Sequence, residues 1–221
     1  MLLKRLQDLL GGIYDVQVGH DVYDFLVTDR MLLPHGARAG HAEEELLVAP
    51  VVAGELALSL YLDPALLQRL AAADPLERLH GGNVADCLTA LEGVSHFLYV
   101  VWNASHDRAV SLLELELQAE IDKFIVSHWL LRRQVPGHFP LELRRALFER
   151  ARIDPNVGAQ AGMYREASGY AGRFCRYLER TLQHTRRAGV RADRDAPLLA
   201  ELRRFYRFST LAKRAYIEQT A

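Results

Sequence analysis

Apolar residues at the start of the chain recur at helical spacing. Five leucines between Leu2 and Leu10 share one face of a short amphipathic helix, because residues three or four positions apart lie on the same side of a helix. Gly11-Gly12 follows, and a glycine pair is typical of a break in a helix. We therefore expect a first helix that ends near residue 10.

The next fifty residues alternate between apolar and polar positions, as half-buried strands do. The expected strands cover residues 13–18, 22–28, 45–52 and 55–62. Short turns at residues 19–21 and at Ala53-Gly54 join neighbouring strands, and strands joined in this way pair antiparallel. An N-terminal antiparallel sheet of three or four strands follows.

From Asp63 onward the pattern is helical. Asp63 is a good N-cap and Pro64 suits the first helical position, and the same pair at Asp74-Pro75 predicts a second short helix. Ser111 and Glu114 form a capping box that starts a longer helix. Helices are expected at residues 84–103, 111–130, 141–152, 161–187 and 197–219.

The helices at 84–103 and 111–130 are joined by a short polar segment, which favours an antiparallel helical hairpin. Their apolar positions follow the three-four spacing of a core face. Six apolar residues are expected to form the contact between the two helices: Leu91, Val94, Leu98, Leu117, Ile121 and Phe124.

These elements predict an α+β protein in which the antiparallel sheet precedes a mostly helical bundle. Residues 1–62 form the β part with its leading helix, residues 63–133 the central hairpin region, and residues 141–221 a set of basic helices. The segment 134–140 contains two prolines and a glycine and is the best boundary. We expect the three parts to form one compact unit.

Composition places the chain among ordinary globular proteins, with 50% apolar and 25% charged residues. Its first ten residues lack the continuous apolar core of an export signal, and we find no uncharged apolar stretch of about 18 residues. A cytoplasmic protein without a membrane span is expected. Cys87 and Cys175 lie among apolar neighbours and are expected to be buried thiols.

The charge is unevenly distributed. Residues 1–130 contain 8 Lys and Arg and 19 Asp and Glu, whereas residues 131–221 contain 19 and 9. Such asymmetry points to a charged partner, and the basic half could face nucleic acid, an acidic protein or anionic lipid. Alternatively, the two halves face each other and neutralise within the fold.

Basic residues in the last two expected helices form the candidate binding surface for an anionic partner. In the first of these helices, the three-four spacing places Arg173, Arg176, Arg180, His184 and Arg187 on one face. In the second, aromatic residues interleave with Arg203, Arg204 and Arg207. Basic and aromatic side chains together are typical of single-stranded nucleic-acid binding, although a face paired within the chain gives the same pattern.

The central hairpin carries a candidate metal cluster. Glu92 and His96 are helical neighbours, and Glu116 and Glu120 could face them from the second helix. Carboxylates and histidines on paired helices can hold metal ions, but the Glu-x-x-His spacing of the di-metal class is absent. We therefore expect neither a metal ion at Glu92 and His96 nor a cofactor. His35 and His41, which flank a glycine loop, lack companions at ligand spacing.

Gly162, Gly169 and Gly172 are unusual because glycine costs about 1 kcal/mol in a helix interior. Close approach of another helix would explain them, and so would a ligand lying against that surface.

Phosphate-binding loops, nucleotide fingerprints, zinc-finger spacings and nucleophile elbows are lacking. Three functions remain open. The first is a non-catalytic interaction or accessory protein that binds a protein partner through charged helical surfaces. The second is a nucleic-acid-binding protein that uses the basic C-terminal helices. The third is a metal-dependent hydrolytic enzyme that uses the central hairpin. Nothing in the sequence indicates the oligomeric state.

Overall fold

A computed structural model of the chain describes residues 1–34, 42–50, 56–136, 139–149, 160–187 and 196–220. The N-terminal elements are α1 (Leu2–Tyr14), η1 (Val22–Phe25), β1 (Leu26–Val27), η2 (Arg30–Leu32), β2 (Glu44–Pro50) and β3 (Leu56–Leu62). The helices that follow are α3 (Pro64–Ala72), α4 (Val84–Ala104), α5 (Leu112–Gln134), α6 (Leu143–Phe148), α7 (Ala161–Arg187), α8 (Ala196–Tyr206) and α9 (Thr210–Thr220).

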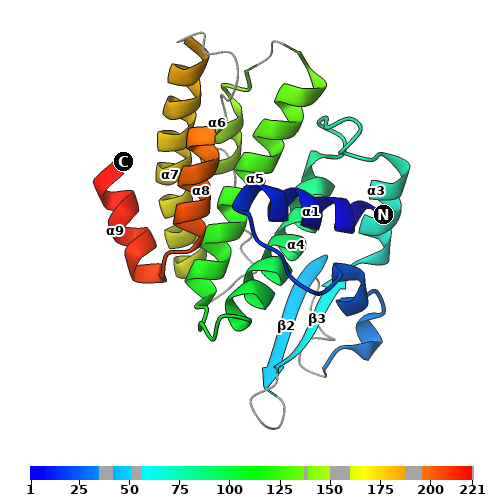
Figure 1. Cartoon of the computed structure of the whole chain (residues 1–221). Coiled ribbons are helices and arrows are strands. Elements are labelled where there is room, and N and C mark those ends of the chain that lie inside the picture. The colour runs from blue at the N-terminus through cyan, green and yellow to red at the C-terminus, as the bar shows by residue number, and fades with distance from the viewer. Residues whose placement is uncertain (35–41, 51–55, 137–138, 150–159, 188–195, 221) are drawn as a thin grey trace.

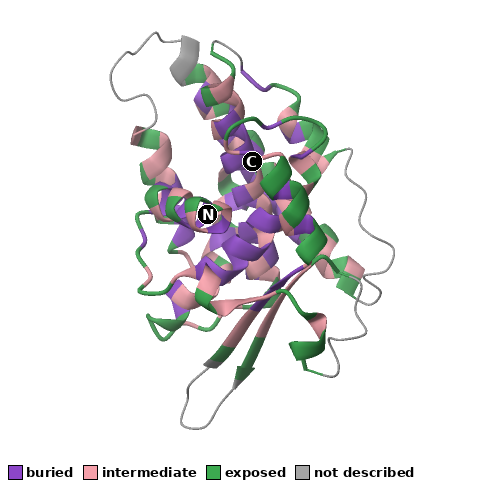
Figure 2. Cartoon of the chain, turned by 90° about the vertical axis from the view of Figure 1, so that its right-hand side faces the viewer, coloured by how far each residue is buried: buried purple, intermediate pink, exposed green. Residues whose placement is uncertain are grey.

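The helix α5 lies at the centre of the bundle, packed against α4 on one side and α7 on the other (Figure 1). The helix α1 packs against α4 and α8, and the β2–β3 hairpin lies against α4. One continuous hydrophobic core includes residues from all three parts of the chain that the sequence distinguishes. Buried residues gather where the helices meet, and the described strand residues farthest from the helices are exposed (Figure 2).

The expected α+β arrangement, an N-terminal sheet followed by a helical bundle, is confirmed. The six residues expected to join α4 and α5 are all buried, and the side chain of Leu98 is 2% exposed. Asp63 caps α3 by accepting a hydrogen bond from the Ala65 amide at 2.7 Å. Ser111 caps α5 by accepting one from the Glu114 amide. Cys87 and Cys175 are buried thiols.

The sheet differs from the expectation in its first strands. The segment 13–18 is not a strand, because α1 continues through the glycine pair and buries Ile13 and Tyr14 on the leucine face. Asp15, with a φ of 53°, ends the helix in the left-handed conformation. Most of 22–28 is the 3₁₀ turn η1, because the side chain of Asp21 binds the Tyr23 amide at 3.0 Å.

The strand order is β1-β3-β2, so the sheet is mixed. The strands β2 and β3 pair antiparallel as expected, with Leu46 opposite Leu60. The strand β1 pairs parallel with β3, with Leu26 beside Leu60. A parallel pair needs a long connection, and here β2 itself supplies part of that connection.

Other expected helices differ from those observed. The residues after Asp74-Pro75 form only a turn, in which the Asp74 side chain binds the Leu76 amide. Of the helix expected at 141–152, the described residues form α6, which begins at Leu143 and ends at Phe148, and residues 150–152 lie outside the described part of the chain. The helix expected at 197–219 is divided into α8 and α9, because Ser209 starts a new helix and its carbonyl accepts from the Lys213 amide at 2.8 Å.

By length and composition alone, α4 could cross a membrane. Within the fold, 56% of the most apolar 18-residue stretch of α4 is buried by the rest of the chain. The central helix of a soluble protein has the same character, so this composition is weak evidence for a membrane span.

Replacement of two glycines by alanine is expected to have opposite effects on stability. A Cβ at Gly93 of α4 would lie 2.9 Å from Glu44 Cγ and from Leu60 Cδ1, whereas nothing lies within 4 Å of one at Gly169 of α7. Gly93 therefore allows the hairpin to approach α4. Of the α7 glycines that suggested close packing, Gly172 meets Phe148 of α6 at 3.2 Å, and Gly162 and Gly169 face open space.

We expect Gly93→Ala to lower the free energy of unfolding by about 1–2 kcal/mol, because overpacking outweighs the gain in helix propensity. The matched change Gly169→Ala should raise it by about 0.5–1 kcal/mol. Urea denaturation of both variants beside the wild type measures the difference. Stabilisation of both variants alike would disprove the close approach at Gly93.

Candidate metal centre

Two buried polar clusters lie between α4 and α5, and they differ in how well their hydrogen bonds are satisfied. The first is built around Asp122, which accepts hydrogen bonds from the Tyr14 hydroxyl, from Ser95 Oγ at 2.5 Å and from Gln118 Nε2 at 2.9 Å. Tyr14 belongs to α1 and Ser95 to α4, so this carboxylate ties both helices to α5. We call this group the Asp122 network.

The Asp122 network continues to α9 through Lys213, which is fully buried. Its ammonium donates to Gln118 Oε1 at 2.9 Å and to the Tyr99 hydroxyl at 2.8 Å. Tyr99 in turn donates to Glu114, which also accepts from Thr210. Each polar group has a partner within the chain, which indicates a structural role.

The second cluster is formed by Glu92 and His96 of α4, Glu116 of α5 and Glu44 of β2. One oxygen of Glu44 lies 3.4 Å from His96 Nδ1, and one oxygen of Glu116 lies 3.7 Å from His96 Nε2. One atom each of Glu92, His96 and Glu116 could ligate a metal ion, and these three atoms all lie within 4.8 Å of one another. We call these four residues the Glu-His cluster.

The Glu-His cluster leaves buried atoms unsatisfied. Within the described part of the chain, five buried side-chain polar atoms lack a hydrogen-bond partner, and one of them is His96 Nε2. Glu44 Oε1 is another, because its 3.4 Å contact with His96 Nδ1 is an ion pair without hydrogen-bond geometry. A buried polar atom without a partner is rare and costs roughly 1–3 kcal/mol. The contrast with the satisfied Asp122 network indicates that the Glu-His cluster is arranged for something other than stability.

Lys123 of α5 provides positive charge beside the cluster. Its ammonium lies 2.9 Å from Glu92 and 2.8 Å from Glu120. Burial alone would lower the pKa of Lys123, but Glu92 and Glu120 outweigh burial and raise it. Of the cluster's side chains, that of Glu92 is the most exposed, at 25%, so the cluster meets solvent on that side.

The electrostatics show an excess of negative charge. Burial raises the pKa of Glu116 to about 7, and nearby carboxylates add to the shift. Burial would lower the pKa of His96, but Glu44, Glu116 and Glu92 raise it to about 9. Burial and the same carboxylates raise the pKa of Tyr164 on α7 to about 12. The cluster therefore attracts cations, and a proton on His96 is the simplest of them.

Sequence reasoning found part of this site. It named Glu92, His96 and Glu116, which the fold brings together, and Glu120, which lies beside them bound to Lys123. It missed Glu44, although strand alternation places Glu44 on the same face as Leu46 and opposite to Glu43 and Glu45. It also missed Lys123, which is seven residues after Glu116 and thus on the same helix face. His35 and His41 lie outside the described residues.

The arginines of the candidate anionic surface serve different purposes. Arg173, Arg176 and Arg180 are exposed on α7, whereas the side chain of Arg187 lies outside the described residues. Arg204 pairs with Glu201 at 3.2 Å and stacks over the Tyr216 ring.

Arg203 and Arg207 bind the end of α1 rather than facing a partner. Arg203 donates to the carbonyl oxygens of Gly12 and Ile13, each at 3.2 Å. Arg207 donates to those of Tyr14 and Asp15, at 3.1 and 2.9 Å. These carbonyls form the negative end of the helix dipole, where cations are stabilising. Part of the basic half is therefore used within the fold.

Comparison with protein-family models, with curated proteins and with solved structures finds no match for this chain.

The Asp122 network predicts a pH dependence of stability. Burial raises the pKa of Asp122 from 3.8 to about 6, despite its three hydrogen bonds. Between these values the folded state binds the proton more tightly than the unfolded state, so stability falls as the pH rises. The loss amounts to up to about 3 kcal/mol and is complete above pH 6. In Asp122→Asn this contribution should disappear.

Urea midpoints at pH 4 and pH 6.5 measure this difference, with Asp8→Asn as the control because Asp8 is exposed. An identical pH dependence in the wild type and in Asp122→Asn would show that Asp122 titrates at its ordinary pKa.

Proposed function

We propose that the protein is a metal-dependent hydrolytic enzyme that binds one divalent transition-metal ion in the Glu-His cluster. The observation that carries this proposal is the convergence of Glu92, His96 and Glu116 around the unpartnered His96 Nε2. Imidazole nitrogen together with carboxylate oxygen is a ligand set for Zn²⁺, Mn²⁺ or Fe²⁺. This reverses the expectation from the helix spacing, which considered only the di-metal class.

Glu44 strengthens the argument because it faces the other nitrogen of His96, at 3.4 Å. A histidine that ligates a metal through one nitrogen commonly donates its other N–H to a carboxylate, which fixes the ring and raises its basicity. In this arrangement Glu44 orients His96, and Glu92, His96 Nε2 and Glu116 are the ligands. Ligand atoms about 2.1 Å from an ion lie within about 4.2 Å of one another, so small side-chain rotations would close the cluster.

Three protein ligands leave a coordination position for water, as in catalytic rather than structural metal sites. A divalent ion lowers the pKa of its bound water toward 7 and so supplies a nucleophile at neutral pH. The side chain of Glu92 is 25% exposed, so the cluster reaches solvent at that residue. An ester or phosphoester is the substrate class that this chemistry suits.

The first test is metal binding. Full-length protein stripped with a chelator is titrated with Zn²⁺ and with Mn²⁺ by calorimetry, and one equivalent is expected to bind. His96→Ala and Glu116→Gln should abolish this binding, and Glu44→Gln should weaken it roughly 10- to 100-fold. His184→Ala, a change at an exposed histidine, should leave it unaltered. Failure of the wild type to bind either ion would refute the proposal.

Hydrolysis is tested separately with metal-loaded protein and activated p-nitrophenyl esters and phosphodiesters. Turnover should require the metal and disappear in His96→Ala. Stoichiometric metal binding without turnover of either substrate class would reject the hydrolytic half of the proposal. Metal binding should also raise stability, by about 2.7 kcal/mol at a hundredfold excess over Kd.

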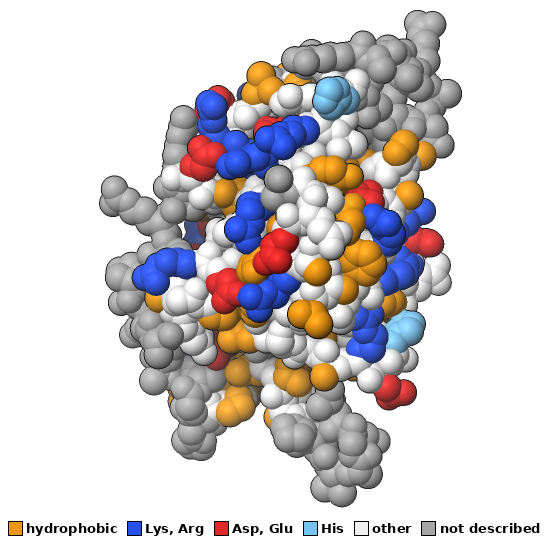
Figure 3. Space-filling view, turned by 90° about the vertical axis from the view of Figure 1, so that its left-hand side faces the viewer, with side chains coloured by type: hydrophobic (Ala, Val, Ile, Leu, Met, Phe, Trp, Pro, Cys, Tyr) orange, Lys and Arg blue, Asp and Glu red, His pale blue; other side chains and the backbone are white. Residues whose placement is uncertain are grey.

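The second candidate function is the binding of an anionic partner, either an acidic protein or a nucleic acid. It is favoured by the exposure of Arg173, Arg176 and Arg180 along α7. Against it, Lys and Arg side chains alternate with acidic and apolar ones on the face shown in Figure 3, so they form no unbroken basic area there.

Reversal of Arg173, Arg176 and Arg180 to glutamate tests this function. If the stripe binds nucleic acid, the triple variant should lose oligonucleotide binding while its melting temperature stays the same, because exposed charges contribute little to stability. Wild-type affinity should fall with salt, with a log–log slope of about 0.7–0.9 per phosphate contact. Reversal of the exposed Arg78 is the control. Absence of oligonucleotide binding at low salt would exclude nucleic acid as the partner.

A further inference from the structure

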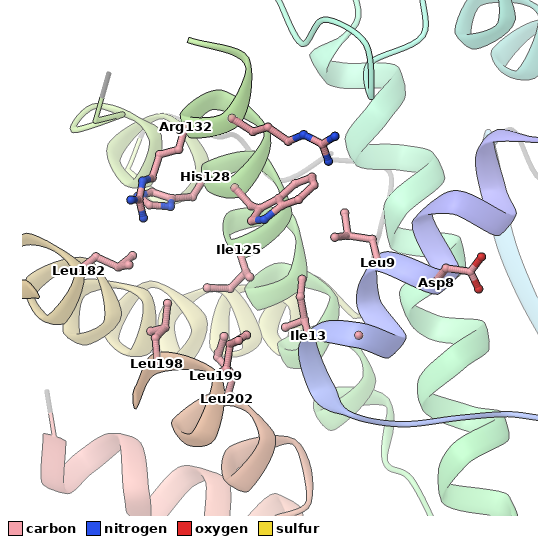
Figure 4. A pocket seen from close by; sticks show the side chains of 13 residues that line it. Asp8, Leu9, Ile13, Ile125, His128, Arg132, Leu182, Leu198, Leu199 and Leu202 are labelled. Carbon is pink, nitrogen blue, oxygen red and sulfur yellow. The ribbon is translucent and has the colours of Figure 1, made fainter. Parts of the chain in front are cut away.

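A cavity of about 490 Å³ lies between α1, α5, α7 and α8 (Figure 4). This volume is within the range of small-molecule sites. Its walls are mainly aliphatic and come from all four helices: Leu9, Ile13, Ile125, Leu182, Leu198 and Leu199. Trp129 of α5 also lines it. Walls of this kind favour contact with the apolar part of a ligand.

The polar groups of the cavity gather on α5. His128, Arg132 and Arg133 line it at that end, and Asp8 of α1 lines it elsewhere with its carboxylate 2.6 Å from Lys4. Arg132 lies close enough to His128 for its charge to disfavour a proton on the imidazole. The guanidinium of Arg133 is exposed and lies 5.0 Å from the centre of the Trp129 ring.

His128 is the group that points to a ligand. Its side chain is 5% exposed, and its Nε2 atom is buried without a hydrogen-bond partner. Burial lowers its pKa to about 4, so the ring is neutral and can donate one hydrogen bond. The ring packs against Phe139, with centroids 5.1 Å apart, which holds it in place beside the cavity.

We propose that this cavity binds a free long-chain carboxylate, with the acyl chain among the leucines and the carboxylate at His128 and Arg132. The aliphatic walls match the chain, and the unpartnered His128 Nε2 and the neighbouring cation of Arg132 match the head group. The volume admits a single chain, which favours a free carboxylate over the surface of a bilayer. This inference is independent of the metal centre, because the residues that line the two sites are different.

Tryptophan quenching offers a direct test. Of the two tryptophans in the chain, Trp129 lines the cavity and Trp102 does not. In a Trp102→Phe background, an undecanoate brominated at its far end should quench Trp129 fluorescence in a saturable manner, at concentrations below micelle formation. The uncharged alcohol of the same length should bind more weakly. Absence of saturable quenching would overturn the proposal.

Two variants place the ligand. His128→Leu removes the donor and should raise Kd roughly 10- to 100-fold, as loss of a charge-assisted hydrogen bond does. Leu198→Trp fills the cavity and should abolish binding of dodecanoate measured by calorimetry. Arg145→Gln, at an exposed arginine of α6, is the control and should bind normally. Far-ultraviolet circular dichroism shows whether each variant is folded.

Unaltered dodecanoate binding in both His128→Leu and Leu198→Trp would place the ligand elsewhere and refute the assignment. A parallel experiment with lipid vesicles distinguishes a free fatty acid from a membrane lipid as the source of the acyl chain. Binding to phosphatidylglycerol vesicles together with no binding of monomeric dodecanoate would identify a membrane-surface site and would overturn the proposal. If Leu198→Trp does not fold, His128→Leu and the chain-length dependence of Kd decide the matter.

Discussion

A charged side chain that leaves water must find an opposite charge, a hydrogen bond or a proton, and this constraint organises the centre of the protein. The α4–α5 hairpin buries acidic side chains on both sides of its apolar seam. On one side Asp122 accepts from two hydroxyls and an amide, and Glu114 accepts from two hydroxyls. The ammonium of Lys213 donates to Tyr99 and Gln118 of the same network. On the other side, His96 and Lys123 are the only described residues that form ion pairs with Glu44, Glu92 and Glu116. The first side ties helices together, and the second retains an affinity for cations.

The Glu-His cluster depends on the close approach of the β2–β3 hairpin to the backbone of α4. Gly93 lets the hairpin lie so near to α4 that a single methyl group would touch both Glu44 and Leu60. The carboxylate of Glu44 then reaches His96, which lies three residues after Gly93 in α4. A position without a side chain thus determines where a charged one from another element can act.

The fold was predictable where apolar periodicity was strong. The helices α4, α5 and α7 and the β2–β3 hairpin follow from their spacing and from the caps at Asp63 and Ser111. The errors arose where local signals competed with burial: Gly11-Gly12 suggested a break, but Ile13 and Tyr14 gained more by completing the leucine face of α1. Ser209 is a good N-cap residue and marks the break between α8 and α9. The apolar pattern continues across it, so a single helix was expected.

The candidate site was only partly predictable for a different reason. Residues within the hairpin, such as His96 and Glu116, are related by helical spacing, so sequence alone brings them near each other. Glu44 comes from a strand about fifty residues earlier, and its position depends on how the sheet packs against α4. The cavity beside His128 depends on four helices at once, and no spacing along the chain encodes such a meeting.

The contact between Arg203 or Arg207 and the end of α1 has a consequence for synthesis. The carbonyls of Gly12 and Ile13 are joined to a side chain some 190 positions later. At ribosomal rates of about 5–20 residues per second, the arginine partners of these carbonyls are synthesised on the order of ten to forty seconds later. During that time the nascent chain carries a helix whose end is incomplete. Arg203 and Arg207 therefore complete the end of α1 only after some 190 further residues have been synthesised.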